Sequence, residues 1–432
     1  MVKFGLLKYL IKNTLLFLTV LVLFTCQTKR QYTSKPTKSL VNPDSDLLEA
    51  NAIAYHINDS VTTTYLEIKN ENLLYKRPDT TKAFYAELRI SYKLLTEQNS
   101  RKIVDSGTFI LEDRAAGEYV KMKSIYSQFK LKAYLGNNYY LQIDIFDTNR
   151  KIKYSEGINV YKLNRFTDQN FLVTLRDSVS FKNNFLANDE VIVRFTNPAI
   201  TQVTVDCFFK EFGPALPPFS TRAPDELKYK PDSVFVMRLS TNQFRLIMPE
   251  KGFYHVKTET QSFEGLTLYT YDKTFPGVSN SDEMINCTRY IMSREEFENC
   301  KDAADKKQCI DHFWLTLGGS NERARELLKK YYGRVKEANK NYSSYTQGWK
   351  SDRGMIFIVF GPPTNIYKSK SDEIWVYGNE ANPNGLRYVY NKTQNPFTDN
   401  DFVLERSQFF KDNWYTAVEY WRQGLIYLDN RK

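Results

Sequence analysis

Apolar and polar residues alternate along this chain from about residue 48 to residue 275. Segments such as TYLEIK, AELRISYKLL and YYLQIDIFD place apolar side chains at every second position, which is the period of a half-buried β-strand. Asn, Gly and Asp separate these segments, and the 30 Tyr and 29 Phe of the chain are residues that favour strands. The pattern predicts antiparallel sheets packed face to face, as in immunoglobulin-like β-sandwiches.

The alternating region is long enough for two such domains. An immunoglobulin-like sandwich takes about 100 residues, so we expect a first sandwich over residues 47–162 and a second over residues 163–277. Residues 214–231 include five prolines. Because proline donates no hydrogen bond to a β-ladder, we expect a long ordered loop there, crossing one edge of the second sandwich.

Helical patterns replace the alternation after residue 277. Ser293 and Glu296 are spaced as a capping box, which starts a helix. The segment SNERARELLKKYYGRVKEANKNY has apolar residues at the spacing of one helix face and predicts a helix of about 20 residues. Four strand-like runs follow, GMIFIVFG, EIWVYGN, LRYVYNK and DFVLERS, with Asn-Pro-Asn-Gly at 382–385 as a hairpin signal. Residues 278–432 therefore predict an α+β domain with a small antiparallel sheet.

The first 25 residues have the features of a secretory signal peptide. Three lysines precede an apolar run over residues 15–24 that is too short to span a membrane comfortably. The run leads into Leu-Phe-Thr-Cys, which resembles a bacterial lipobox, so we expect acyl chains such as palmitate on Cys26. Residues 26–46 are polar and predict a flexible tether. An ordinary signal peptide or an uncleaved anchor is the alternative.

The residues after Cys26 indicate where such a lipid would lie. Gln27 stands where many inner-membrane lipoproteins have Asp, which favours the outer membrane. Residues 27–32 contain no acidic residue, whereas surface-exported lipoproteins of the Bacteroidota resemble one another in carrying an acidic cluster there. These resemblances imply an outer-membrane lipoprotein, anchored through its lipid on the periplasmic face.

The balance of charged residues narrows the classes of partner. Lys and Arg exceed Asp and Glu by 60 to 50 without a basic block that contains aromatics, so we expect no nucleic-acid partner.

Four cysteines besides Cys26 predict disulfides in an oxidising compartment, with three possible pairings. Cys300 and Cys309 are nearest in the sequence and are our first expectation for a bridge. Their spacing lacks a CxxC motif or a nearby His pair, so we expect no metal site and no cofactor.

Five motifs in the last third of the chain resemble a known family. They are RYIMSREEFENC, DHFWLTLGG, NERARELLKKYYGRVKEANKNY, QGWKSDRGMIFIVFGPP and DEIWVYGN, in that order. Together they resemble the GWxTD domain, named for Gly-Trp-x-Thr-Asp and found in exported proteins and lipoproteins of Bacteroidota and some other bacteria. The resemblance covers about residues 281–432, and its one departure is Ser351 in place of Thr. The resemblance implies a role in the cell envelope. It implies no particular biochemical activity, because the family has no general activity that can be carried over.

The motif supports a structural interpretation, in which a turn leads into a strand over residues 355–360. The indole of Trp349 needs a buried place, and the polar groups of the turn can accept hydrogen bonds from its amides. Arg353 can pair with Asp352 or with an acid on the long helix such as Glu337. The residues of this turn are Gly348, Trp349, Ser351, Asp352, Arg353 and Gly354.

The alternative interpretation of the motif is functional. Asp352 and Arg353 would line a cleft between helix and sheet and bind a polar ligand or a partner. Arg334 and Glu322 would contribute to this cleft from the long helix.

Catalysis has little support in the sequence. His56, His255 and His312 fall in three different expected domains, and no serine-hydrolase, zinc-protease or phosphate-loop motif is present. Cys309 and His312 could meet on one helix, but a disulfide is the expected fate of Cys309. We therefore expect a protein that is not an enzyme.

One tripeptide, Asp-Ser-Val, occurs three times, with its serine at Ser60, Ser178 and Ser233. It resembles the acceptor for O-glycosylation of exported proteins in Bacteroidota. The alternative is a recurring strand start, because Asp-Ser ends a turn and Val begins a strand.

These observations favour a non-catalytic, lipid-anchored envelope protein that binds other proteins, for example in a secretion or assembly complex. The first alternative is a carbohydrate or cell-wall ligand binder, or an enzyme, with an aromatic cleft in the C-terminal domain. A purely structural spacer is the second alternative. Exposed tryptophans around a cleft in this domain would favour the first alternative, and buried ones would favour a scaffold; they are Trp349, Trp375, Trp414 and Trp421.

Overall fold

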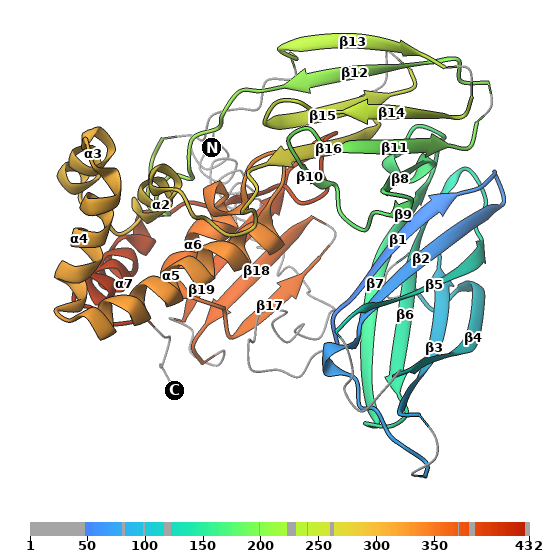
Figure 1. The fold of residues 1–432 in the computed structure, drawn as a ribbon, viewed down its shortest axis with the longest axis horizontal. Helices are drawn as coiled ribbons and strands as arrows, with labels where there is room; N and C mark the ends of the chain where they lie inside the picture. Colours follow the sequence, from blue (N-terminus) through green and yellow to red (C-terminus); the bar gives the residue numbers. More distant parts are fainter. Residues whose placement is uncertain are drawn as a thin grey trace, which may run out of the picture.

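The computed structural model describes residues 48–427, except 80–82, 98–99, 116–121, 198, 223–229, 240, 260–262, 370 and 380–384. The expected signal peptide, the lipidation site at Cys26 and the tether lie outside the described residues, as does most of the Asn-Pro-Asn-Gly turn. Within the described ranges the chain is mostly antiparallel β-sheet, with α-helices confined to its C-terminal part (Figure 1). None of the helices in these ranges is long and apolar enough to cross a membrane.

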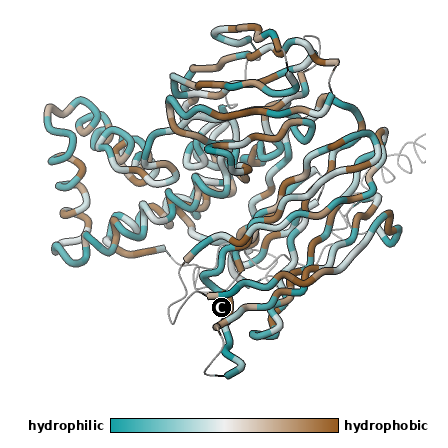
Figure 2. Tube along the Cα trace, turned by 45° about the vertical axis from the view of Figure 1, so that its right-hand side comes forward, coloured by the Kyte–Doolittle hydropathy of each residue, from teal (hydrophilic) through white to brown (hydrophobic). Residues whose placement is uncertain are grey.

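The first β-domain consists of two sheets around one apolar core. One sheet has the order β1-β2-β5 and the other β4-β3-β6-β7, and every pairing is antiparallel. Apolar and polar residues alternate along these strands (Figure 2), so each strand buries one face. The strands are β1 (Ala50–His56), β2 (Val61–Lys69), β3 (Tyr85–Leu95), β4 (Ile103–Arg114), β5 (Ser124–Lys132), β6 (Asn137–Asp147) and β7 (Ile152–Lys162).

The second β-domain repeats this arrangement with a larger sheet. Its sheets have the orders β10-β16-β15-β12-β13 and β14-β11-β8-β9, with a core between them. Only the short pairing of β10 with β16 is parallel among these described strands. The strands are β8 (Phe171–Leu175), β9 (Ser178–Val179), β10 (Asn184–Leu186), β11 (Glu190–Phe195), β12 (Gln202–Phe208), β13 (Ser233–Arg238), β14 (Gln243–Ile247), β15 (Gly252–Lys257) and β16 (Leu266–Tyr271).

The C-terminal domain packs helices on a four-stranded antiparallel sheet with the order β17-β18-β19-β20. Ser293 and Glu296 form the predicted capping box at the start of α3, and Ser320 caps α5. The strands are β17 (Asn365–Lys368), β18 (Asp372–Tyr377), β19 (Leu386–Lys392) and β20 (Phe402–Leu404). The helices are α2 (Ser281–Thr288), α3 (Arg294–Asp302), α4 (Lys306–Gly318), α5 (Asn321–Tyr342), α6 (Asp352–Phe360) and α7 (Lys411–Arg422).

The segment predicted as a strand over residues 355–360 is a helix, α6, so this prediction is wrong. All nine of its residues are buried, and a helix that is buried on every side shows no periodic pattern. The helix signals are local: Ser351 caps the N-terminus, and Gly361 follows the last turn with φ of +86°. The fourth strand of the sheet is instead β17, which the sequence reading missed.

The second β-domain and the C-terminal domain share a cluster of aromatic side chains. Phe208, Phe253, Tyr269 and Tyr271 lie on one face of the five-stranded sheet, and Phe397 of the C-terminal domain packs among them. The hydroxyl of Tyr269 also donates to the carbonyl of Phe397 at 2.6 Å. The junction between the two domains is therefore a buried contact.

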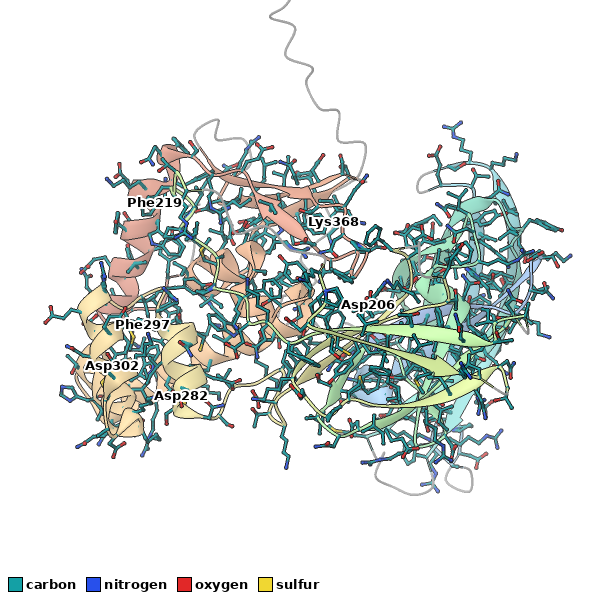
Figure 3. All side chains as sticks on the ribbon, turned by 90° about the horizontal axis from the view of Figure 1, so that it is seen from above. Asp206, Phe219, Asp282, Phe297, Asp302 and Lys368 are labelled. Carbon is teal, nitrogen blue, oxygen red and sulfur yellow. A yellow bond between two sulfur atoms is a disulfide. The ribbon has the colours of Figure 1, made fainter. Side chains whose placement is uncertain are left out.

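The proline-rich segment also joins these two domains. It was predicted to cross an edge of the second β-domain, but residues 215–219 contact the C-terminal domain. The amide of Ala215 donates to the carbonyl of Lys350 at 2.8 Å. The ring centroid of Phe219 lies 5.4 Å from that of Tyr415 on α7. Figure 3 labels Phe219 in this part of the molecule. These contacts hold the segment against the Gly-Trp turn and α7.

Candidate functional site

Two glycines allow the Gly-Trp turn to lie close to its neighbours, Gly348 against α5 and Gly354 between the turn and the start of α6. A Cβ at Gly348 would stand 2.0 Å from the carbonyl oxygen of Ala338 on that helix. A Cβ at Gly354 would stand 1.8 Å from the carbonyl oxygen of Gly348. A side chain at Gly348 would force the turn away from α5, and one at Gly354 would force the start of α6 away from the turn, so both positions require glycine for close approach of the backbone.

Trp349 anchors this turn in the core, where its side chain is 3% exposed. Its backbone amide donates to Oδ1 of Asn339 on α5 at 3.0 Å, and its indole N–H donates to Oε1 of Gln347 at 2.7 Å. Its carbonyl accepts from the hydroxyl of Tyr290 at 2.9 Å. Asn339 also donates to the carbonyl of Pro276, which ties the turn to the start of the domain. Each polar group of Trp349 therefore has a partner inside the protein.

Ser351 is the N-cap of α6. Its hydroxyl accepts from the amide of Gly354 at 3.0 Å and donates to the carbonyl of Gly348 at 2.7 Å. These two bonds connect the turn to the first turn of the helix. Threonine has the same hydroxyl, so the departure of this sequence from the Gly-Trp-x-Thr-Asp pattern preserves the cap.

Asp352 forms a buried ion pair with Arg406, a residue that the sequence reading did not identify. Its carboxylate also accepts from the amide of Leu404 at 2.8 Å. Arg406 in turn donates to the carbonyl of Leu216 in the proline-rich segment at 3.1 Å. Burial raises the pKa of Asp352, and the neighbouring Arg406 acts in the opposite direction. The pair links α6, the strand β20 and the segment from the second β-domain.

Arg353 pairs with Glu373 on β18, at 3.2 Å between Nη1 and Oε2. Nη2 donates to the backbone and side-chain oxygens of Asn400, and the guanidinium lies 4.1 Å from the ring centroid of Phe402. Glu373 accepts a second hydrogen bond from the indole N–H of Trp375 at 2.5 Å. Arg353 and Glu373 are almost fully buried, so this contact fastens the helix to the sheet.

Arg334 of α5 binds the C-terminal end of α6. Its guanidinium donates to the carbonyls of Ile358 at 3.0 Å and Val359 at 3.2 Å, and to that of Tyr427 at 2.8 Å. The first two are in the last turn of α6, where carbonyls lack partners within the helix and attract a cation. Burial lowers the pKa of Arg334 to about 10.

The predicted partners of the charged motif residues were wrong. Arg353 pairs with neither Asp352 nor Glu337 but with Glu373, which is 20 residues away. Asp352, Arg353 and Arg334 are buried and bonded within the domain, whereas Glu322 is exposed at the start of α5. The structure does not bring these four residues to one cleft. The sequence contains one signal for the partner of Arg353. Glu373 stands at the start of the apolar segment EIWVY, and an acid in a buried segment needs a partner of opposite charge.

The buried histidines have structural partners. His56 contacts the Thr62 hydroxyl and the Tyr161 carbonyl, both at 2.9 Å. His255 contacts the Thr267 hydroxyl at 2.9 Å and a backbone carbonyl at 3.0 Å. Burial lowers the pKa of each imidazole to about 4, so both are neutral at pH 7. His312 is exposed on α4. The structure does not bring the three histidines together.

The cysteines and the Asp-Ser-Val serines lie in different surroundings. Cys300 on α3 is bonded to Cys309 on α4, with 5.4 Å between their Cα atoms. Cys207 and Cys287 are free and buried. The three serines, Ser60, Ser178 and Ser233, are exposed at or just before the starts of β2, β9 and β13. In the described part of the chain no group of three His, Cys, Asp or Glu residues could hold a metal ion.

A polar cavity of about 1000 Å³ lies where the two β-domains and the C-terminal domain meet. Asn138 and Tyr161 line it from the first β-domain, Asp168 from the link to the second, and Lys392 and Asp399 from the C-terminal domain. No local sequence pattern indicates this cavity, because its walls come from three separate parts of the chain.

Fold and turn together define a multidomain protein in which two all-β domains precede a helix-and-sheet domain built around a buried Gly-Trp turn. The GWxTD domain family model matches residues 252–423, and the chain is therefore a GWxTD domain-containing protein. The match begins at β15, earlier than the motifs indicated, and so includes β15 and β16, two of the strands that pack against Phe397. No curated protein matches the chain significantly.

Proposed function

We propose that this chain is a non-catalytic, lipid-anchored protein of the cell envelope that mediates protein–protein interaction, as a component of a secretion or assembly complex. In this proposal Cys26 carries the lipid, on the periplasmic face of the outer membrane in a member of the Bacteroidota. The two β-domains are immunoglobulin-like sandwiches that serve as spacers or docking surfaces.

The observation that carries this proposal is the series of buried bonds through the Gly-Trp turn. Asp352 and Arg406 connect α6 to the carbonyl of Leu216, and Ala215 bonds Lys350 in the turn itself. The aromatic cluster around Phe397 joins the same two domains. A protein held in one arrangement presents its surfaces at fixed positions, which is what a scaffold for other proteins requires. The motif residues are used for this purpose and are not available to a ligand.

Affinity purification of the tagged full-length chain from detergent-solubilised envelope tests the proposal. We expect a defined set of envelope proteins to be recovered at constant ratios. The variant Arg406→Met, which removes the bond between the proline-rich segment and α6, should reduce recovery of the partners, whereas the matched control Arg325→Met should leave it unchanged. Recovery of the chain alone, with the lipid in place, would contradict the proposal and favour a spacer.

Binding of a carbohydrate or cell-wall ligand is the second candidate function. Its site would differ from the aromatic cleft of the C-terminal domain that the sequence suggested. The four tryptophans that it would need are buried, with exposures of 3%, 0%, 5% and 0% for Trp349, Trp375, Trp414 and Trp421. The polar cavity between the three domains favours it instead, because amide, hydroxyl and aromatic groups are the groups that bind sugars. Binding of purified peptidoglycan fragments, lost in Tyr161→Ala, would support this candidate, and no binding would exclude these ligands.

A further inference from the structure

Strand β13 forms one edge of the five-stranded sheet and lies at the top of Figure 1. Among the described residues it pairs only with β12, in antiparallel register from Gln202 opposite Arg238 to Cys207 opposite Ser233. Half of its backbone N–H and C=O groups therefore point away from the sheet, because these groups alternate in direction along a strand. An edge of this kind can accept a further strand.

The side chains of this edge are apolar and exposed. Val234, Phe235 and Val236 are 52%, 37% and 56% exposed, and no charged residue interrupts them. Soluble proteins protect long edge strands with a charge, a proline or a bulge in the middle. The edge strand β14 of the opposite sheet follows this rule, since Arg245 occupies its centre. The β13 edge lacks such protection.

We propose that β13 pairs antiparallel with β13 of a second copy of this chain, about a two-fold axis through Phe235. In this register Phe235 lies opposite its counterpart, Val234 lies opposite Val236 of the other copy, and Ser233 lies opposite Met237. Residues opposite each other in an antiparallel pair share a face, so the valines meet on one face and the phenylalanines on the other. The two five-stranded sheets become one ten-stranded sheet.

The charged residues at the two ends of β13 favour this register, and they favour a second copy of this chain as the partner of the edge. With Phe235 on the axis, Asp232 of each copy lies opposite Arg238 of the other, on the face that carries the valines. Arg238 is exposed and has no ion pair within the described ranges. One oxygen of Asp232 accepts from the amide of Phe209 at 2.7 Å, which holds the carboxylate in place. Two ion pairs then flank an apolar centre, and opposite charges across strands stabilise the pairing.

The pairing and a glycan at Ser233 exclude each other. Ser233 begins β13 and lies in the proposed interface, so a sugar on its hydroxyl would prevent a second strand from approaching. We therefore expect Ser233 to be unmodified in the dimer. Glycopeptide mass spectrometry that finds Ser233 fully occupied in the native protein would overturn the proposal.

The first experiment measures the mass of the full-length chain in detergent by light scattering over a dilution series. We expect a dimer for the wild type and a monomer for Val236→Lys, which places a charge at the centre of the edge. The matched control is Ile110→Lys on β4, an edge strand of the first β-domain where Ile110 is 65% exposed. A monomeric wild type, or a Val236→Lys variant that is still dimeric, would overturn the proposal.

The second experiment tests the register by exchanging charges. Asp232→Arg and Arg238→Asp should each lose the dimer, since like charges meet at both ends. An equimolar mixture of these two variants should recover it, since every end pair then has opposite charges. Recovery requires folded chains, so this result remains informative even if one substitution alone destabilises the domain. A mixture that stays monomeric would refute the register.

Discussion

Replacing Arg406 by methionine tests whether the motif acts as a lock between domains. Methionine keeps an apolar stem of similar length but removes the guanidinium that faces Asp352. The carboxylate of Asp352 is 7% exposed and would retain the amide of Leu404 as its hydrogen-bond donor. Removing one partner of a buried ion pair destabilises a protein by about 3–5 kcal/mol.

Protonation of Asp352 limits this penalty and makes it depend on pH. Loss of Arg406 raises the folded pKa of Asp352 further above that of the unfolded chain, since burial is then opposed only by the hydrogen bond from the amide of Leu404. At pH 7, protonating an ordinary carboxyl takes about 4.2 kcal/mol, and at pH 5 about 1.5 kcal/mol. The variant should therefore lose about 3–4 kcal/mol at pH 7 and recover roughly 2–3 kcal/mol of that loss at pH 5.

Urea unfolding of both chains, followed by tryptophan fluorescence at pH 5, 6 and 7, measures these differences. Arg325→Met is the matched control, because Arg325 is exposed on α5 and its loss should change the free energy of unfolding by less than about 0.5 kcal/mol. A penalty for Arg406→Met that is equal at pH 5 and pH 7 would refute the reasoning, because it would show that no buried carboxylate is left without its partner.

Four further sets of substitutions probe the turn, the disulfide and the anchor. Ser351→Ala should destabilise the domain by about 1 kcal/mol in thermal unfolding while Ser351→Thr stays within about 0.5 kcal/mol of the wild type, since only alanine removes the cap; equal losses would contradict the capping role. Gly348→Ala should lower the yield of folded protein sharply, because the added Cβ meets the α5 backbone, and a fully soluble variant would show that the turn can move. Cys300→Ser with Cys309→Ser should lower the free energy of unfolding by about 2–3 kcal/mol, and an unchanged midpoint on reduction of the wild type would speak against the bridge. Cys26→Ser should abolish incorporation of labelled palmitate, and retained label would place the lipid elsewhere.

Local patterns were sufficient to predict much of the fold. Alternation at period two predicted the sheet-rich region, because a strand that buries one face shows that period wherever it lies. The capping box at Ser293 and the amphipathic pattern before Tyr342 predicted α3 and α5 for the same reason: their signals lie within a few residues of each other. The five C-terminal motifs were also sufficient to recognise the GWxTD domain.

Tertiary contacts decided the rest. Residues 355–360 were mistaken for a strand because the fold encloses them on all sides, and a segment that is buried on every side lacks the periodic pattern that distinguishes a helix from a strand. Asp352 found Arg406 at a distance of 54 residues, and Arg353 found Glu373 at 20, so neither partner could be read from spacing. The cavity between three domains and the exposed edge at β13 likewise depend on which segments the fold brings together. A sequence specifies the faces that must be buried, whereas the partners across a buried face are known only once the chain is folded.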